Sequence, residues 1–291
     1  MIGKQCEALR FPRDAQEHLQ MAENLLLAQP NGEQILLDAE RRLFTPGDER
    51  FNERLNRLAQ LARVNPMQSD MVLLLRSAPR LLEEYRRRNL PESVYWDTMA
   101  DLRYKLMECY AVHALWGTFV VWWFKGFYLC ERFALGRLQY EIRPVEVEDY
   151  RGIVKKGDPV PNIHIPSAGP LSRNRVLDSL ARAYAFYPQL QRDGILPVMC
   201  SSWLLYPPQF DVYPEGGNLR DFVAMFDILS TEERADNPDF WRIFDVMYTP
   251  EILDYVPQDT RLRRNFLHYF REGGTLGEGH GILLFDGEKL I

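Results

Sequence analysis

Cysteine is scarce in this chain, and its spacing excludes the common cysteine-based frameworks. The four cysteines are scattered over 291 residues with no CxxC pair, at Cys6, Cys109, Cys130 and Cys200. A disulfide scaffold or a structural zinc site would need closely spaced cysteines. We therefore expect four free thiols in a reducing compartment.

Long hydrophobic runs are also absent. The most apolar stretch, residues 114–124 (ALWGTFVVWWF), is about half the roughly 20 residues that a spanning helix needs. The first twenty residues, MIGKQCEALRFPRDAQEHLQ, contain charged and amide side chains throughout, unlike a secretory signal. We expect a cytoplasmic protein with no membrane partner.

The chain has no excess of positive charge. Its 35 basic and 41 acidic residues give a formal net charge of -6, which argues against nucleic acid as a partner. Residues 1–130 carry 17 basic and 17 acidic side chains, which leaves 18 and 24 for residues 131–291. The acidic second part is most simply a solvated acidic surface, with a cationic or amine substrate as the alternative explanation.

Strand-like alternation is missing from the first part of the chain. Apolar residues recur there at three- and four-residue spacing, which predicts amphipathic helices. The turn signals are Pro30-Asn31-Gly32, Thr45-Pro46-Gly47 and Asn65-Pro66. We predict an all-helical N-terminal domain at residues 1–128, including a helix from Met67 to Arg88 and another after Pro91.

From about residue 129 the pattern changes to short strands alternating with helices. FYLCERFALGRLQYEI predicts a strand pair, VPNIHIP and PVMCSSWLLYP predict strands, and residues 173–187 predict a helix between these two. We expect a second domain at residues 129–291, of α+β or mixed α/β class, with a mixed sheet flanked by helices. Near the end, Thr260 is expected to cap a helix that runs to Arg271, with GHGILLFDG as the final strand.

Several standard catalytic signatures are absent, namely GxxxxGK[ST], GxGxxG, HExxH and GxSxG. The five histidines are isolated from one another, and none forms a pair with metal-ligand spacing. We predict no metal cofactor.

The segment 162–175 (NIHIPSAGPLSRNR) is the most informative. A strand that feeds a loop of small residues and then a helix N-terminus suits an anion such as a pyrophosphate, because unpaired N–H groups and the helix dipole point at it. Arg173 and Arg175 would add positive charge. The alternative is a plain strand-to-helix connection with Ser172 as the N-cap.

The arrangement resembles the GNAT acyltransferase superfamily, and specifically bacterial proteins that join a helical N-terminal acyltransferase domain to a GNAT-like C-terminal domain. The resemblance is carried by FALGRLQYE (133–141), HIPSAGPLSRNRVLDSLARA (164–183) and CSSWLLYP (200–207), with weaker support from GGNLRDF and EGGTLGEGHG. It implies that acyl-CoA or acetyl-CoA lies between the strands VPNIHIP and PVMCSSWLL. The cofactor-binding residues would be Ile165, Ser167, Ala168, Gly169, Leu171, Ser172, Arg173 and Asn218.

The expected reaction moves an acyl group to an amine or hydroxyl of an unidentified small-molecule or peptide acceptor by direct attack. His164 is the candidate base, and Glu141 would position the acceptor. The resemblance implies Ser202 or Tyr206 as the group that returns a proton to the thiolate. Cys200 is an alternative nucleophile, and Asn218 is alternatively a helix cap.

Two other functions fit the sequence. One is a catalytically inactive module that keeps the fold and binds a small ligand or protein. The other is a hydrolase that uses paired carboxylates, either Glu141 with Glu146 or Asp211 with Glu215. The aromatic run from Trp116 to Tyr128 is expected to form a helix face between the two domains, or a surface that binds a ligand or partner.

Overall fold

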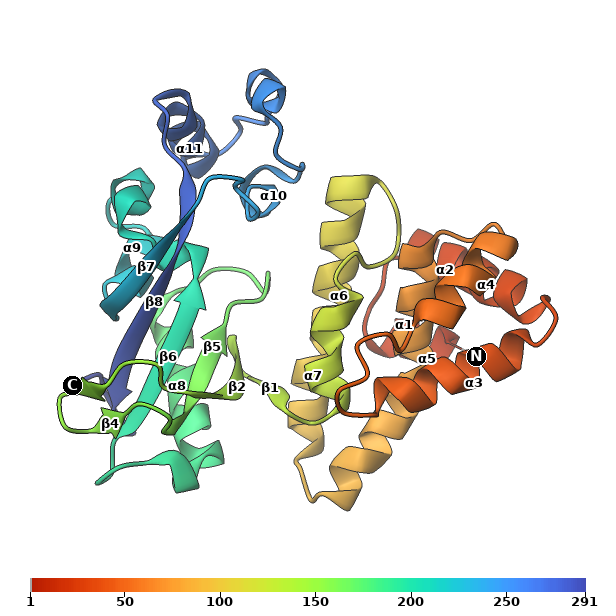
Figure 1. Ribbon diagram of the computed structural model, residues 1–291, viewed down its shortest axis with the longest axis horizontal. Helices are drawn as coiled ribbons and strands as arrows, with labels where there is room; N and C mark the ends of the chain where they lie inside the picture. Colours follow the sequence, from red (N-terminus) through yellow and green to blue (C-terminus); the bar gives the residue numbers. More distant parts are fainter. Residues whose placement is uncertain (1) are drawn as a thin grey trace. The chain divides into compact units, whose positions relative to one another are not determined.

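The computed structural model describes residues 2–291, which separate into two compact units between Phe133 and Ala134 (Figure 1). The first unit is helical, and the second holds the sheet, as the sequence predicts. The domain boundary near residue 128 stays a prediction. Among the described residues, no helix is both long and apolar enough to cross a membrane.

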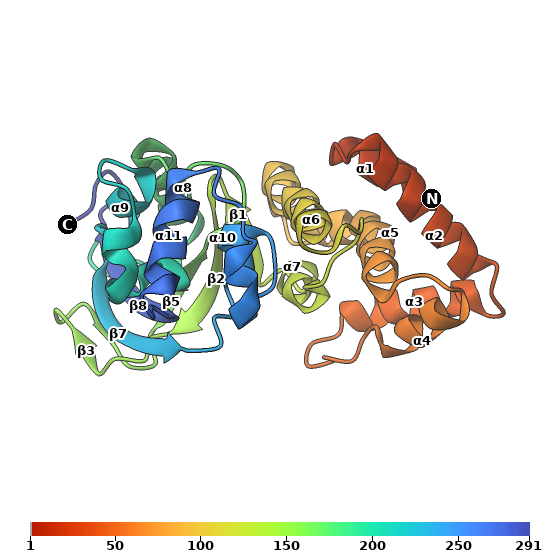
Figure 2. The ribbon, with the colours of Figure 1, turned by 90° about the horizontal axis from the view of Figure 1, so that it is seen from above.

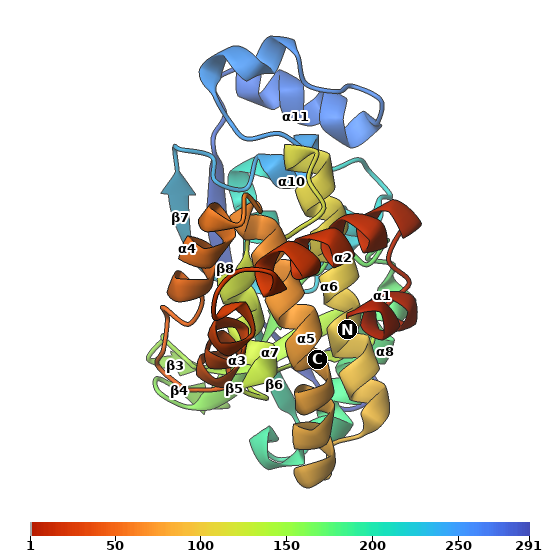
Figure 3. The ribbon, with the colours of Figure 1, turned by 90° about the vertical axis from the view of Figure 1, so that its right-hand side faces the viewer.

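The first unit is built around one long central helix. Helix α5 begins with Pro66 behind the N-cap Asn65, whose side chain accepts a hydrogen bond from the Met67 N–H. Its middle is buried on nearly every side, which is typical of a helix enclosed by others, and it contacts the helices around it (Figures 2 and 3). The helices are α1 (Gly3–Ala8), α2 (Arg13–Leu27), α3 (Gly32–Leu43), α4 (Glu53–Leu61), α5 (Pro66–Arg87) and α6 (Glu92–His113).

One buried arginine inside the first unit is paired with two carboxylates. The Arg76 guanidinium lies 2.9 Å from Glu23 and 2.7 Å from Glu33, and the Arg76 and Glu23 side chains are 8% and 1% exposed. Burial raises the pKa of Glu23, but hydrogen bonds from Arg76 and Gln20 outweigh it and hold the pKa below its usual range. These contacts join α2, α3 and α5, so they serve the packing of the bundle.

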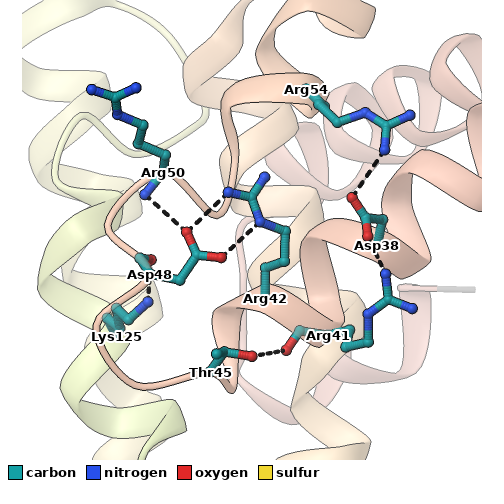
Figure 4. Close-up of polar contacts among 8 residues, drawn as sticks. All are labelled: Asp38, Arg41, Arg42, Thr45, Asp48, Arg50, Arg54 and Lys125. Carbon is teal, nitrogen blue, oxygen red and sulfur yellow. Dashed lines mark hydrogen bonds and ion pairs between the residues drawn. The ribbon is translucent and has the colours of Figure 1, made fainter.

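A polar cluster holds the loop between α3 and α4 (Figure 4). Asp48 accepts two hydrogen bonds from Arg42, at 2.7 and 2.9 Å, and one from the Arg50 N–H at 3.2 Å. Lys125 donates to the Asp48 carbonyl and lies over the ring of Phe51. Because every contact ends on this loop or its neighbours, the cluster orders the loop.

The aromatic run does not form the single helix face that the sequence predicts. Helix α6 ends at His113 with Ala114 in the left-handed conformation (φ 51°). A loop, the 3₁₀ turn η1 (Val121–Phe124) and the short helix α7 (Lys125–Tyr128) follow. The spacing of aromatic residues reflects burial, which loops and short turns share with helices. Helix α6 itself begins at Glu92, directly after Pro91, as the sequence predicts.

The second unit contains a six-stranded sheet in the order β1-β2-β5-β6-β8-β7. Strands β5 and β6 are parallel and joined through α8, while β2, β8 and β7 run antiparallel to their neighbours. The strands are β1 (Arg132–Leu135), β2 (Leu138–Pro144), β5 (Pro159–His164), β6 (Leu196–Ser202), β7 (Asp227–Arg234) and β8 (Leu276–Phe285), with the hairpin β3 (Asp149–Tyr150) and β4 (Val154–Lys155).

Helices and 3₁₀ turns connect these strands. They are α8 (Arg173–Phe186), η2 (Pro188–Leu190), η3 (Trp203–Leu205), η4 (Pro207–Val212), α9 (Asn218–Val223), α10 (Trp241–Phe244), η5 (Pro250–Asp254) and α11 (Arg261–Arg271). Thr260 caps α11 as the sequence predicts, because its Oγ1 accepts from the Arg263 N–H.

The pairing of the strands divides the sheet into two faces. Side chains alternate along a strand, so the paired residues Glu141–Asn162, Asn162–Met199 and Met199–Ile282 share one face. We call this face A, and the opposite one, which contacts α8, face B. At one end face A is apolar, where Val160, Met199 and Ile282 pack with residues of the β3–β4 region.

Face B of β8 is lined by alternating glycines, which explains the GEGHG segment. A Cβ on Gly279 would lie 1.9 Å from the Leu205 carbonyl oxygen, and one on Gly277 would lie 2.5 Å from the Tyr206 ring. The glycines therefore allow η3 and Tyr206 to lie directly on the strand. As a consequence, Glu278 and His280 are on face A.

Candidate functional site

The loop between β5 and α8 is held from inside the protein by one buried arginine. The guanidinium of Arg137, only 5% exposed, donates to the carbonyl oxygens of Pro166 at 2.9 Å, Gly169 at 2.7 Å and Pro170 at 3.2 Å. Charged hydrogen bonds of this kind are stronger than neutral ones. Arg137 thus fixes the loop's shape and places a positive charge beneath it.

The same contacts decide which way the loop's N–H groups point. In a planar trans peptide the carbonyl and the following N–H point in opposite directions, so the N–H groups of Ser167 and Leu171 point away from Arg137. Gly169 has a φ of 89°, a conformation that residues with a side chain rarely adopt. The buried arginine therefore collects the loop's carbonyl groups on its own side and turns these two N–H groups to the other side.

The loop ends at the N-terminus of α8, where the helix dipole is positive. Ser172 is the N-cap, as the sequence indicates, and its side chain makes no capping hydrogen bond to the described residues. Arg173 and Arg175 are exposed in the first turn, and Arg175 reaches the Ala168 carbonyl at 3.5 Å. The predicted loop residues, Ile165, Ser167, Ala168, Gly169, Leu171, Ser172 and Arg173, are consecutive or nearly so and lie together here.

His164 ends β5 on face A and pairs with a carboxylate from β2. Its Nε2 lies 2.8 Å from Oε1 of Glu141, and the two side chains are 19% and 10% exposed. Arg143 donates to the same Glu141 oxygen at 2.7 Å, and the Asn162 amide nitrogen is 3.4 Å from Nε2. The pair exists because the strand register sets Gln139 opposite His164, which puts Glu141 on the same face.

This pairing has a direct chemical consequence. When Nε2–H donates to Glu141, the basic nitrogen of the neutral ring is Nδ1. A carboxylate in this position orients the imidazole and stabilises the charged ring that forms when Nδ1 takes a proton, as in catalytic triads. Glu141 therefore contacts the candidate base, and its expected role in positioning the acceptor stays a prediction.

A second polar pair lies on face A, formed by one residue of β6, the strand next to β5, and one residue of β8, the strand after it. The Nδ1 of His280 on β8 is 2.8 Å from the Ser201 Oγ on β6. One ligand atom each of Glu232, Glu278 and His280 lie within 4.8 Å of one another. Arg234 contacts Glu278 and lies 3.8 Å from Glu232, so its single positive charge offsets part of the negative charge of the two carboxylates.

The proton donors that the sequence suggested lie on face B. The Ser202 Oγ accepts a hydrogen bond from the Leu204 N–H at 3.2 Å, which caps η3. Tyr206 is 8% exposed and packs on Gly277, and burial raises its pKa. The structure does not bring either side chain to the face that holds His164.

Asn218 is the first residue of α9, and Gly217 is the N-cap, so Asn218 does not cap this helix. The helix contacts α8 and η3, which places it on the face B side of the sheet. Asn218 itself is exposed.

The nucleophile and hydrolase alternatives find little support in the geometry. Cys200 is buried on face B, and burial raises the pKa of its thiol, which disfavours the thiolate. Asp211 and Glu215 both pair with Arg220 and are 98% and 88% exposed. Glu146 is exposed in the segment after β2, and Glu141 is engaged by His164.

Sequence reasoning missed Arg137, Ser201 and His280. Arg137 contacts a loop about thirty residues away, and no local pattern predicts such a contact. A signal did exist for His280, because glycines at alternate positions 277, 279 and 281 mark a strand face that carries no side chains.

Two family models match the chain. A model described as the GNAT-like C-terminal domain matches residues 133–283, which is more than half of the chain, and one described as the N-acyltransferase N-terminal domain matches residues 2–130. The chain belongs to this acyltransferase family. No curated protein matches it.

Solved structures show the same fold at low sequence identity. An acyltransferase in complex with decanoyl-CoA and teicoplanin is 19% identical, with a TM-score of 0.74 over 96% of this chain and 86% of that chain. An acyltransferase in complex with CoA and 10C-teicoplanin is 19% identical, with a TM-score of 0.73 over the same shares. Another, in complex with decanoyl-CoA, is 20% identical, with a TM-score of 0.61 over 97% and 99% of the two chains.

Proposed function

We propose that this protein is an acyl-CoA-dependent N-acyltransferase that acylates an amine on a small molecule or peptide. The observation that carries the proposal is a loop of small residues, fixed by Arg137, that directly follows the His164–Glu141 pair and leads into the N-terminus of α8. The family match supports the reaction class. The similar structures are complexes with decanoyl-CoA and teicoplanin or with CoA and 10C-teicoplanin, which supports these kinds of donor and acceptor.

The proposed mechanism uses groups that the chain itself supplies. The loop and the first turn of α8 bind the pyrophosphate, and the pantetheine arm runs toward the ends of β5 and β6. His164 takes the proton of the attacking amine, and Glu141 stabilises the resulting imidazolium. Backbone N–H groups stabilise the oxyanion, which requires neither a metal nor an acyl-enzyme.

The inactive-module alternative differs from this proposal in what it predicts for His164. A binding module needs the loop but has no use for an imidazole oriented by a carboxylate. The buried pairing of His164 with Glu141 at 2.8 Å therefore favours catalysis.

The first test is the melting temperature with CoA, acetyl-CoA and octanoyl-CoA. A ligand at 100 times its Kd stabilises the folded state by about 2.7 kcal/mol. We expect a dose-dependent rise that weakens in Arg173→Ala, at the start of α8. The matched control is Arg182→Ala, which removes a cation further along α8 that pairs with Asp178. No rise with any of the three at millimolar concentration would overturn the proposal.

A further inference from the structure

We propose that Ser201 donates the proton that the leaving thiolate takes up, and that His280 supplies it to Ser201. This inference rests on the proposed function. It assigns protonation of the leaving thiolate to Ser201 and His280, and deprotonation of the amine to His164. All three residues lie on face A.

Strand geometry places Ser201 beside His164. Strands β5 and β6 pair in parallel at Asn162 with Met199 and at Ile163 with Cys200. His164 and Ser201 are the next residues on each strand, and both point to face A because Asn162 and Met199 do. The pairing ends at Ile163 and Cys200, where adjacent strands are about 4.8 Å apart. We place the thioester between the strand ends that follow, in contact with both side chains.

The hydrogen bond between Ser201 and His280 makes the serine able to pass a proton on. A serine hydroxyl alone is a weak acid, but one bonded to an imidazole at 2.8 Å can give up its proton and regain one from the ring. The Ser201 and His280 side chains are each partly exposed, so the ring can recover its proton from water. The groups that face His280 are Ser201, Glu232 and Glu278, with Arg234 on the two carboxylates.

The other candidate donors already have structural roles. The Ser202 hydroxyl caps η3, and Tyr206 packs against the glycine-lined side of β8. Both are on face B. The alternating glycines of β8 leave room for η3 on face B, and the residues between them, Glu278 and His280, lie on face A. One side of β8 therefore packs against η3, and the other side holds the proposed proton relay.

The bonds and protons balance without a further reactant. The amine nitrogen bonds to the thioester carbon, and its proton passes to His164. The carbon–sulfur bond breaks, and sulfur leaves with the electron pair and takes the proton of Ser201 Oγ. Ser201 regains a proton from Nδ1 of His280, and solvent restores both histidines.

The test uses the full chain with octanoyl-CoA and hydroxylamine, a nucleophile that is largely unprotonated at neutral pH and so has little need of a base. Thiol release and hydroxamate formation are both measured. We expect Ser201→Ala and His280→Asn to lower the rate on the order of 10²-fold, while the octanoyl-CoA-induced melting shift is kept. Because His280 acts through Ser201, we also expect the loss in both variants to appear in kcat with the KM for octanoyl-CoA unchanged, and the double variant to be no slower than Ser201→Ala alone.

The matched control is Ser230→Ala. Ser230 is an exposed serine on β7, and it lies opposite His280 in the pairing of β7 with β8. It should transfer at the wild-type rate. Transfer by Ser201→Ala at the wild-type rate would overturn the relay and leave the proposed function standing. An octanoyl adduct on Ser201, found by mass spectrometry without acceptor, would also overturn it, because the serine would then be a nucleophile. Wild-type protein that neither binds octanoyl-CoA nor releases thiol would overturn the proposed function itself.

Discussion

The two units bury charged groups in different ways. In the helical unit, Glu23 and Arg76 lie between helices and form an ion pair with each other. In the sheet unit, His164 and Glu141 are at the end of a strand, and Arg137 lies under a loop that follows it. The buried charges of the helical unit hold helices together. Those of the sheet unit lie at the end of β5 and beneath the loop that leads into the N-terminus of α8.

This difference predicts that changes in the first unit alter stability and changes in the second alter binding and turnover. A buried ion pair contributes little over a well-packed apolar pair, but losing one partner is costly. A polar group at a strand end can be lost at small cost to folding, because part of it is solvated. Measuring melting and acyl transfer on the same variants separates the two effects.

The largest effect is expected from His164→Ala. With octanoyl-CoA and a primary alkylamine, the rate should fall by about 10²–10⁴-fold, because the amine loses its base. The melting temperature should change little. His268→Ala, which removes a 73% exposed histidine on α11, is the control and should retain full transfer. Equal rates in the two variants would remove His164 from the mechanism.

Arg76→Met should have the next largest effect, and on stability only. It leaves Glu23 buried without its main partner, which costs about 3–5 kcal/mol. Urea unfolding measures the loss, and transfer per folded molecule should be unchanged. Arg13→Met breaks the exposed Arg13–Glu17 pair, 93% and 67% exposed, and should cost close to nothing. If the two variants unfold alike, the buried pair has no structural role.

Asp70 predicts a pH-dependent effect in the helical unit. Burial raises the pKa of this carboxyl to about 7, although Asn52 donates to it at 2.8 Å and lowers the pKa in part. Between about pH 4 and pH 7 the folded state therefore holds a proton that the unfolded chain has lost, so stability falls as the pH rises.

Asp70→Asn should remove that fall and stabilise the protein at pH 8 by up to about 4 kcal/mol, with little change at pH 4. Urea unfolding at both pH values measures it. Glu83→Gln, which removes an exposed carboxyl on the same helix, controls for the loss of a negative charge. A gain of the same size at both pH values would contradict the burial explanation.

Elements with a strong local signal could be predicted from the sequence. The helix expected from Met67 to Arg88 spans Pro66–Arg87, and the Thr260 cap is confirmed. Their signals, helical periodicity and a capping side chain, act within a few residues. The prediction of one helix face for residues 116–128 was wrong, because aromatic side chains are buried in turns as readily as in helices.

The candidate site could be predicted only in part, for a related reason. The SAGPLS loop and His164 are visible in one segment of sequence. Alternation shows that Ser201 and Ser202 face opposite sides, but not which side holds His164, because that depends on the pairing of β5 with β6. The loop's partner is Arg137, in the turn between β1 and β2, and the partner of His164 is Glu141, on β2. Their roles therefore follow from tertiary structure.

The smallest effect is expected from Arg137→Lys, which tests whether the loop needs a fork of donors or only a positive charge. A lysine keeps the charge but cannot direct planar donors at three carbonyls, which Arg137 contacts at 2.7, 2.9 and 3.2 Å. We expect the Kd for CoA, from calorimetry, to rise about tenfold, or about 1.4 kcal/mol. Arg182→Lys on α8 is the control and should leave the Kd unchanged. If Arg137→Lys also leaves it unchanged, the loop's shape does not depend on these bonds, and charge alone beneath the loop would account for anion binding.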